Sequence, residues 1–215
     1  MGDMFSFIAK FMSDGGAFMW IIFFVWVGGV CVALERVGAL FKLDVDGPTL
    51  MNELQKYVLS GDIQGAIKVC SGSSSALARV LKNGLKRANQ SLTQMQNAVD
   101  ATALEVIPKV EARMNYLSLV ANISTLIGLL GTIIGLVQSF NAVAVADPSQ
   151  KSELLANGIA TAMNTTALGL ISAISIMVMH TFLSSKGERI VSGIDEYSVK
   201  LMDLLGTEEE VTKSA

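Results

Sequence analysis

One charge-free stretch of the chain constrains its fold most, because no Asp, Glu, Lys or Arg occurs between Arg113 and Asp147. The 24 mostly apolar residues 117–140, at a rise of about 1.5 Å per residue, would form a helix roughly 36 Å long, which is enough to cross a bilayer. We therefore predict that residues 117–140 form a transmembrane helix.

This helix carries a second pattern, a stripe of small and polar residues spaced three or four apart. At 100° per residue, the stripe falls within an arc of roughly 140°. Its members are Ser118, Asn122, Thr125, Gly128, Thr132, Gly135 and Ser139. The stripe has two interpretations: close packing against another membrane helix, which glycines such as Gly131 commonly allow, or a polar path through the membrane.

Two further apolar runs complete a set of three predicted transmembrane helices. Residues 15–34 and 159–183 contain no Asp, Glu, Lys or Arg and are long enough to span a bilayer. With 51% hydrophobic and 16% charged residues, the chain is too apolar for an ordinary soluble domain. The sequence therefore predicts an all-α integral membrane protein.

The segments outside these three runs are more polar. Residues 35–116 are expected to form a small helical domain, and residues 1–14 an amphipathic segment at the membrane surface. Residues 141–158 are expected to form a short loop and residues 184–215 a tail. Four stretches of the domain have helical apolar spacing: 49–60, 62–70, 76–89 and 92–115. No break signal follows the last of them, so the second span is expected to extend as a helix out of the membrane.

Lysine and arginine are distributed unevenly among these segments. Residues 35–116 hold ten and residues 184–215 hold four, whereas residues 1–14 and 141–158 hold one each. By the positive-inside rule, the domain and tail are cytoplasmic and the N-terminus lies outside. The net charge of -3 and the lack of a basic run with interleaved aromatics give no support for a nucleic-acid partner.

The third span repeats the pattern of the second. Its small and polar residues form two adjacent lines, one of Thr161, Thr165 and Ser172, the other of Thr166, Gly169, Ala173 and His180. A hydroxyl without a partner in hydrocarbon costs roughly 1–3 kcal/mol. A single threonine can satisfy itself on the carbonyl four residues earlier, but several aligned on two helices favour a lined cavity. His180 is either an interfacial residue or a pH-sensitive member of an exit path.

None of the three spans contains an Asp, Glu, Lys or Arg residue. A relay through a membrane normally needs an ionisable residue, so either the chain conducts nothing or another polypeptide supplies a carboxylate that faces the threonines. The sequence also shows no nucleophile–base set, metal-ligand cluster or phosphate-binding glycine loop. We expect neither enzyme activity nor a bound metal or cofactor.

Several short motifs occur in a specific order along the chain. Residues 128–132 read GLLGT and residues 165–170 read TTALGL. Further motifs are Leu34-Glu35-Arg36, Gly61-Asp62, Ala78-Arg79-Val80-Leu81 and Gly84-Leu85. From about residue 34 to about residue 205, the chain thus resembles the MotA/TolQ/ExbB proton-channel family, most closely its TolQ/ExbB branch.

This resemblance implies a homopentamer in a bacterial inner membrane, with a periplasmic N-terminus and loop. The pentamer would enclose two copies of a single-span ExbD/TolR-like partner that carries a membrane aspartate. Thr132 and Thr166 match the family threonines that face this aspartate. Flow of H⁺ or Na⁺ would turn the pentamer around the partner and transmit force to the cell envelope. The family often has Glu at the position of Thr161 and Pro at the position of Ser175. Because the Glu is missing here, the resemblance does not decide whether the transported ion is H⁺ or Na⁺.

Two functional hypotheses follow. In the first, the chain is the pore subunit of an ion-driven motor, with His180 as a possible exit-path residue. The candidate ion-pathway residues are Asn122, Thr125, Thr132, Thr161, Thr165, Thr166 and Ser172. In the second, the chain is a non-conducting membrane scaffold whose small faces only pack helices. The candidate packing residues in both are Gly128, Gly131, Gly135 and Gly169.

Overall fold

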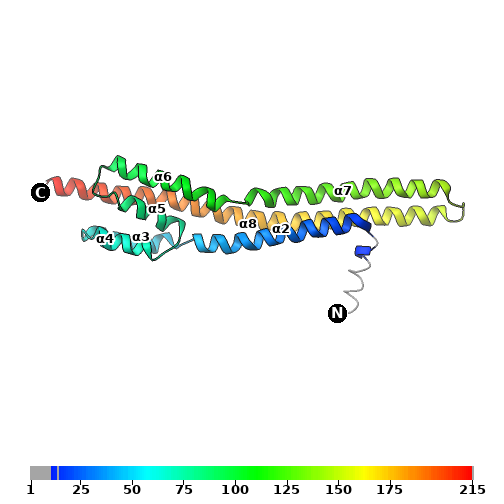
Figure 1. Cartoon of the computed structure of the whole chain (residues 1–215), viewed down its shortest axis with the longest axis horizontal. Coiled ribbons are helices and arrows are strands. Elements are labelled where there is room, and N and C mark those ends of the chain that lie inside the picture. Colours follow the sequence, from blue (N-terminus) through cyan, green and yellow to red (C-terminus); the bar gives the residue numbers. More distant parts are fainter. Residues whose placement is uncertain (1–10, 14, 215) are drawn as a thin grey trace, which may run out of the picture. The chain divides into compact units, whose positions relative to one another are not determined.

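The computed structural model describes residues 11–13 and 15–214, and their regular structure is helical, without a strand (Figure 1). The helices are α2 (Gly16–Leu43), α3 (Gly47–Leu59), α4 (Ile63–Ser71), α5 (Ala76–Leu85), α6 (Leu92–Glu111), α7 (Met114–Val145) and α8 (Lys151–Ser214). Three helical stretches of the described residues are long and apolar enough to cross a membrane. The prediction of an all-α protein with three candidate spans is confirmed. The amphipathic segment 1–14 lies mostly outside the described residues.

The chain divides into two compact units. The first comprises Met1–Leu34 with Arg113–Thr181, and the second comprises Glu35–Ala112 with Phe182–Ala215. The first unit therefore contains α7 and the N-terminal parts of α2 and α8. The second unit contains α3 to α6 together with the remainders of α2 and α8. The placement of the second unit in the cytoplasm stays a prediction.

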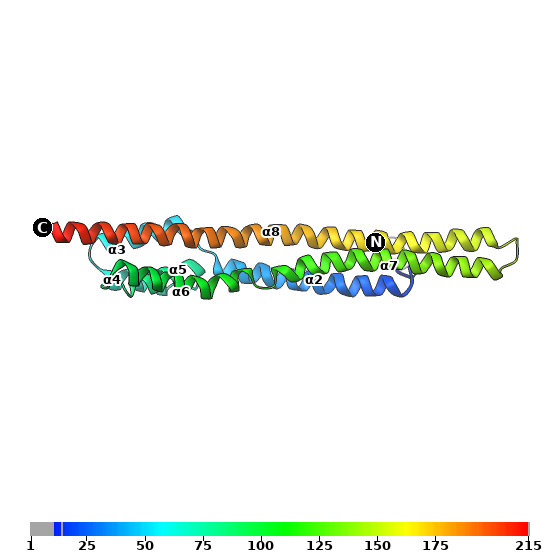
Figure 2. The ribbon, with the colours of Figure 1, turned by 90° about the horizontal axis from the view of Figure 1, so that it is seen from above.

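In the first unit, α7 and the first part of α8 lie beside each other along a seam of small residues (Figures 1 and 2). A Cβ atom at Gly135 would lie 3.2 Å from Ala162 Cβ, and one at Gly128 would lie 3.2 Å from Gly169 Cα. The paired residue numbers rise on one helix as they fall on the other, so the two helices are antiparallel. Close approach of the two backbones is possible because these positions lack bulky side chains.

In the second unit, serine and aspartate side chains begin three of the helices. The Asp62 carboxylate accepts a hydrogen bond from Gly65 N at 2.8 Å, and the Ser75 hydroxyl accepts one from Ala78 N at 3.2 Å. The Ser91 hydroxyl accepts from Gln94 N at 3.4 Å. Each bond satisfies one of the amide groups that a helix start leaves without an intrahelical partner.

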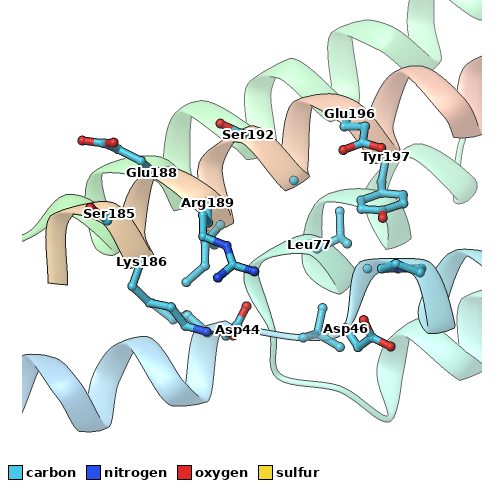
Figure 3. Close-up of a pocket in the computed structure, with 16 residues that line it drawn as sticks. Asp44, Asp46, Leu77, Ser185, Lys186, Glu188, Arg189, Ser192, Glu196 and Tyr197 are labelled. Atoms are coloured by element: carbon cyan, nitrogen blue, oxygen red, sulfur yellow. Dashed lines mark hydrogen bonds and ion pairs between the residues drawn. The ribbon is translucent and has the colours of Figure 1, made fainter. Parts of the chain in front are cut away.

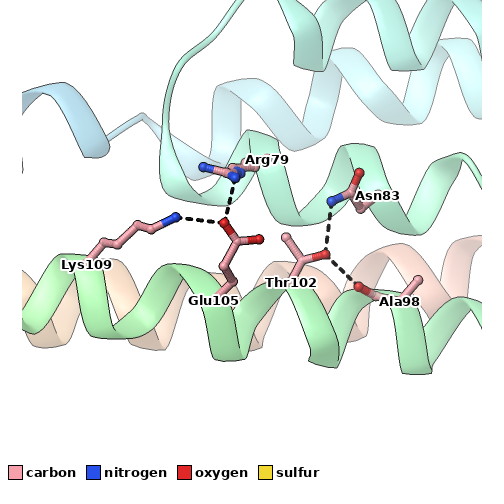
Figure 4. Close-up of polar contacts among 6 residues, drawn as sticks. All are labelled: Arg79, Asn83, Ala98, Thr102, Glu105 and Lys109. Atoms are coloured by element: carbon pink, nitrogen blue, oxygen red, sulfur yellow. Dashed lines mark hydrogen bonds and ion pairs between the residues drawn. The ribbon is translucent and has the colours of Figure 1, made fainter.

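Polar contacts join α5 to α6 (Figure 4). The Asn83 side chain donates to Thr102 Oγ1 at 3.0 Å. Glu105 forms ion pairs with Arg79 at 2.8 Å and with Lys109 at 2.7 Å. The hydrogen bond from Lys109 and the charge of Arg79 lower the pKa of the Glu105 carboxyl below its ordinary value. These three charged side chains are about half exposed, so their contribution to stability is small.

Pro108 predicts a kink near Val106, after which the helix would continue into the second span. In the structure, α6 continues past Pro108 and the interruption comes after Glu111. Helix α6 ends at Glu111, helix α7 begins at Met114, and Arg113 between them has a φ of 62°. This left-handed conformation ends a helix, and it is commonly adopted by glycine or asparagine. The buried Arg36 guanidinium donates from Nη2 to Val110 O at 2.6 Å. It therefore satisfies a carbonyl that the end of α6 leaves without a helical partner.

The connection between α7 and α8 is short. Helix α7 continues to Val145 and helix α8 begins at Lys151, so only residues 146–150 join them. Helix α8 also runs without interruption through residues 184–214, which were predicted as a tail. The helix ends therefore extend beyond the apolar runs on which the sequence prediction was based.

Candidate functional site

The polar stripe predicted on α7 is divided between two surfaces. Its members Gly128 and Ser139 are buried in the seam, together with Ser124 and Gly131. The Cβ position of Gly135 also faces α8. The stripe's other members lie next to the seam and are wholly or partly exposed: Ser118, Asn122, Thr125 and Thr132. The packing interpretation and the polar-path interpretation thus apply to different residues of the stripe.

The hydroxyl residues of α8 divide in the same way. Thr165 is 1% exposed, lies against Gly131 and donates from Oγ1 to Ala162 O at 2.7 Å. Ser172 is 2% exposed. Thr161 and Thr166, in contrast, are partly exposed. Two of the candidate ion-pathway residues, Thr165 and Ser172, therefore lie inside the contact between α7 and α8.

Thr125, Thr132 and Thr166 lie on one side of the seam. At 100° per residue, Thr125 and Thr132 are rotated from Gly128 in the same direction, and Asn122 lies further round on that side. Because α8 is antiparallel to α7, Thr166 occupies the corresponding side of α8. Its Oγ1 donates across to Gly128 O at 3.1 Å. We refer to Asn122, Thr125, Thr132 and Thr166 as the threonine face.

Helix α2 packs against the opposite side of the two helices. Trp26 donates from its indole Nε1 to Ser175 Oγ at 2.7 Å. A Cβ atom at Gly29 would lie 2.8 Å from the side chains of both Val120 and Ile176. Val120 and Ser175 are rotated from the seam away from the threonine face. The first span therefore leaves the threonine face uncovered.

The hydroxyls of the threonine face are satisfied within the chain. Thr125 Oγ1 donates to Ala121 O at 3.2 Å, and Thr132 Oγ1 donates to Leu129 O at 2.6 Å. No Asp, Glu, Lys or Arg occurs in the charge-free runs that form this part of α7 and α8. The face is therefore polar but uncharged, and it has no group that could itself bind and release a proton.

The remaining candidates lie elsewhere. Thr161 is rotated toward the side that α2 covers, away from the threonine face. His180 lies on the same side as Thr166 but about 21 Å further along α8, too far for a direct contact. Among the described residues, no group of three or more His, Cys, Asp or Glu could hold a metal ion.

Sequence reasoning did not identify the polar link between α2 and α8. Tryptophan is a residue type that commonly anchors a helix at the membrane interface, but Trp26 lies too deep within its apolar run for that role. Its depth was the one available signal that its indole N–H has an intramembrane partner. The Ser175 hydroxyl that accepts this bond itself donates to Ser172 O at 2.8 Å.

The chain is similar to several known proteins. Residues 73–196 match the model of the MotA/TolQ/ExbB proton channel family. A putative biopolymer transport protein ExbB homolog of Methanothermobacter thermautotrophicus is 22% identical over 222 aligned positions, which cover 99% of this chain and 78% of that protein. Tol-Pal system protein TolQ of Pseudomonas aeruginosa is 32% identical over 83 residues, 39% of this chain and 36% of TolQ.

A solved structure has a similar fold. The structure of C. jejuni MotAB matches with a TM-score of 0.61 and 15% sequence identity, over 86% of this chain and 72% of the matched chain. At this identity the similarity concerns the fold alone. It is consistent with the arrangement of long helices described above.

Proposed function

We propose, because the chain belongs to the MotA/TolQ/ExbB proton channel family, that it is the ring-forming pore subunit of an ion-driven motor in a bacterial inner membrane. The family and the TolQ/ExbB branch predicted from the motifs are confirmed by the matches to ExbB and TolQ proteins. A multi-pass membrane protein also agrees with the three apolar helical stretches. In this proposal the N-terminus is periplasmic and the C-terminus is cytoplasmic, as the positive-inside rule predicts.

The observation that carries the proposal is the uncovered threonine face. Tight packing of α7 on α8 accounts for the glycines and for the buried Thr165, but it does not require hydroxyls at Thr125, Thr132 and Thr166. Each of these hydroxyls donates to a backbone carbonyl of the chain itself, so the groups that remain for a neighbour on the exposed surface are the lone pairs of the hydroxyl oxygens. A partner helix with a carboxyl group opposite Thr132 and Thr166 would supply a donor for them.

In the proposed assembly, five copies of the chain surround two single-span partners of the ExbD/TolR type. The partner's membrane aspartate is the group that takes up and releases the ion, because this chain has no membrane carboxylate. The threonine face binds that carboxyl group as it passes from subunit to subunit. Movement of the ring relative to the partner would then transmit force to the cell envelope.

The transported ion is H⁺ or Na⁺ in this proposal. If the partner's carboxyl group contacts only hydroxyls, it can pass from subunit to subunit in its protonated form. The transported ion is then H⁺. Hydroxyl and carbonyl oxygens can also coordinate Na⁺, a hard cation that prefers oxygen ligands. Ion-flux measurements with each cation in turn would decide between them.

The test is to replace the hydroxyls by methyl groups of the same shape. We expect Thr132→Val and Thr166→Val to leave the ring assembled but to reduce ion flux in proteoliposomes by at least about tenfold, the effect of losing one hydrogen bond of about 1.4 kcal/mol. The control is Thr181→Val, because the Thr181 hydroxyl is exposed and donates to Met177 O at 3.0 Å in the same manner. Thr181 lies on the same side of α8 as Thr166 but about 22 Å further along the helix axis, so it does not belong to the threonine face.

The alternative is a non-conducting scaffold, which the tight glycine seam also supports. In that case both valine variants would behave like the unmodified protein in the flux assay. Gly131→Leu, which would place a side chain on Thr165, would still disrupt assembly. An unmodified protein that carries no ion flux, together with a Gly131→Leu variant that fails to assemble, would therefore replace the motor proposal by the scaffold.

A further inference from the structure

The second unit contains a cavity that the ion path does not use (Figure 3). Its volume is about 840 Å³, and it lies between the connection from α2 to α3 and the part of α8 that begins at Ser185. The walls carry charged residues of both signs: Asp44, Asp46, Lys186, Glu188, Arg189 and Glu196. The lining of the cavity is therefore suited to a charged or dipolar ligand.

The charges in the walls are not equally satisfied. Each carboxylate has a partner: Lys186 for Asp44, Thr49 for Asp46, Ser184 for Glu188 and Lys200 for Glu196. The Arg189 guanidinium has no hydrogen-bond or ion-pair partner among the residues that the structure describes. Figure 3 shows it pointing from α8 into the cavity. The cavity thus offers one cation to an incoming negative group.

Taking the end of the third apolar run as the edge of the hydrocarbon core places the cations at the depth of lipid phosphates. Lys186 and Arg189 lie roughly 5 Å and 9 Å beyond Leu183, the last apolar residue of the third run, along the axis of α8. The headgroup layer adds roughly 5–8 Å to each side of the hydrocarbon core. A phosphate of the adjoining leaflet is therefore within reach of both side chains.

Apolar side chains adjoin the same cations. Lys186 Nζ lies 5.7 Å from the ring centroid of Phe41, which is 70% exposed. Phe182, one turn before Lys186 on α8, is 75% exposed. Phe182 lies on the membrane side of the basic pair, where aromatic surface can contact acyl chains below a headgroup. Free inorganic phosphate would make no use of these rings.

The distribution of charge along the cavity favours a dipolar headgroup. Figure 3 shows Lys186 and Ser185 at one end, and Asp46 and Glu196 with Tyr197 at the other. Four carboxylates and two cations line the walls, so a net anion would be repelled overall. A phosphate followed by a primary ammonium places its negative charge at Arg189 and its positive charge toward the acidic end.

We propose that this cavity binds a phospholipid headgroup of the phosphoethanolamine type. Arg189 binds the phosphate, Lys186 supports it while paired with Asp44, and the ammonium lies toward Asp46 and Glu196. This site is independent of the ion path, because none of its residues belongs to the threonine face.

Native mass spectrometry of the purified complex, titrated with phosphatidylethanolamine, tests the proposal. We expect Arg189→Gln to weaken lipid retention roughly tenfold, as for loss of one charge-assisted hydrogen bond. The matched control is Lys42→Gln, because Lys42 is an exposed cation in the last turn of α2 that does not line the cavity. This control should retain lipid like the unmodified protein.

A second variant blocks the cavity without removing a charge. Gly193 lines the cavity, and a Cβ atom there would meet no atom within 4 Å, so Gly193→Leu is compatible with the fold. We expect it to weaken retention of phosphatidylethanolamine as Arg189→Gln does, without lowering the unfolding temperature, because leucine favours a helix more than glycine does. Phosphatidylglycerol should bind roughly tenfold more weakly than phosphatidylethanolamine, because it has no ammonium group. Unchanged retention in Arg189→Gln, an equal loss in Lys42→Gln, or equal binding of the two lipids would overturn the proposal.

Discussion

Gly169 shows how little space a side chain has at the seam between α7 and α8. A Cβ atom there would lie 2.8 Å from Ser124 O and 3.0 Å from Gly128 Cα, both of which are backbone atoms. Backbone atoms of two packed helices cannot move aside as the end of a flexible side chain can. The position therefore requires glycine for a steric reason.

We expect Gly169→Ala to destabilise the first unit by about 1–3 kcal/mol, the usual cost of overpacking. The control is Gly28→Ala on α2, where a Cβ atom would meet nothing within 4 Å. That change should be neutral or stabilise the helix by up to about 1 kcal/mol. Thermal unfolding of the detergent-solubilised protein measures both, and an equal effect of the two substitutions would contradict the steric argument.

Cys70 provides a second prediction for a single residue. Its side chain is 1% exposed, and burial raises the pKa of its thiol to about 11. Because the thiolate is the reactive form, alkylation by iodoacetamide at pH 8 should be roughly a hundredfold slower in the folded protein than in the unfolded one. The experiment uses the Cys31→Ser variant, since Cys31 is exposed and would otherwise react. Rapid labelling of the folded variant would show that α4 opens readily.

At the scale of helices, Arg36 holds the end of α6. Its Nη2 donates to Lys109 O at 3.1 Å and to Val110 O at 2.6 Å, next to the break at Arg113. We expect Arg36→Met to cost about 2–3 kcal/mol, because it leaves these carbonyls without the guanidinium. Hydrogen exchange at residues 106–111 should become faster, and Arg36→Lys should give an intermediate rate. Unchanged exchange in Arg36→Met would mean that α6 ends there without help from α2.

The same region shows why one helix boundary could not be predicted. Helix ends are read from glycine, asparagine, proline and capping side chains, and residues 112–113 include none of these. Arg113 adopts a left-handed conformation that its residue type disfavours. The contact that accompanies the break comes from Arg36, which is 73 residues from Lys109 in the sequence. A contact between residues so far apart cannot be predicted from the residues around the helix end.

The α7 stripe was predictable as a pattern but not as a packing surface. Spacing identified Gly128, Gly135 and Ser139, which face α8 in the structure. It also included Thr125 and Thr132, which directly follow the buried residues Ser124 and Gly131 and lie beside the seam, not in it. Neighbouring positions on a helix differ by only 100°, so a broad polar arc fits more than one partner direction. The position of α8 decides which edge of the arc becomes buried.

At the scale of the whole molecule, the three apolar spans followed from length and composition, which need no tertiary information. The proposed ring requires a further test. We expect native mass spectrometry of the detergent-extracted protein, expressed with a single-span partner that carries a membrane aspartate, to show five copies of this chain with two partner chains. Expression without the partner is the control and should give the ring alone. A monomer or dimer that ignores the partner would contradict the motor proposal.

The hydrogen bonds of the threonine face have a consequence for the acid that visits it. A hydroxyl has one hydrogen and two lone pairs, and Thr125, Thr132 and Thr166 each direct their hydrogen to a backbone carbonyl. Toward a neighbouring helix they therefore present lone pairs only. A carboxylic acid can donate its own O–H to them, whereas an ionised carboxylate finds no donor unless a threonine gives up its carbonyl. The face thus discriminates between the two forms of one side chain and stabilises the neutral form within the membrane.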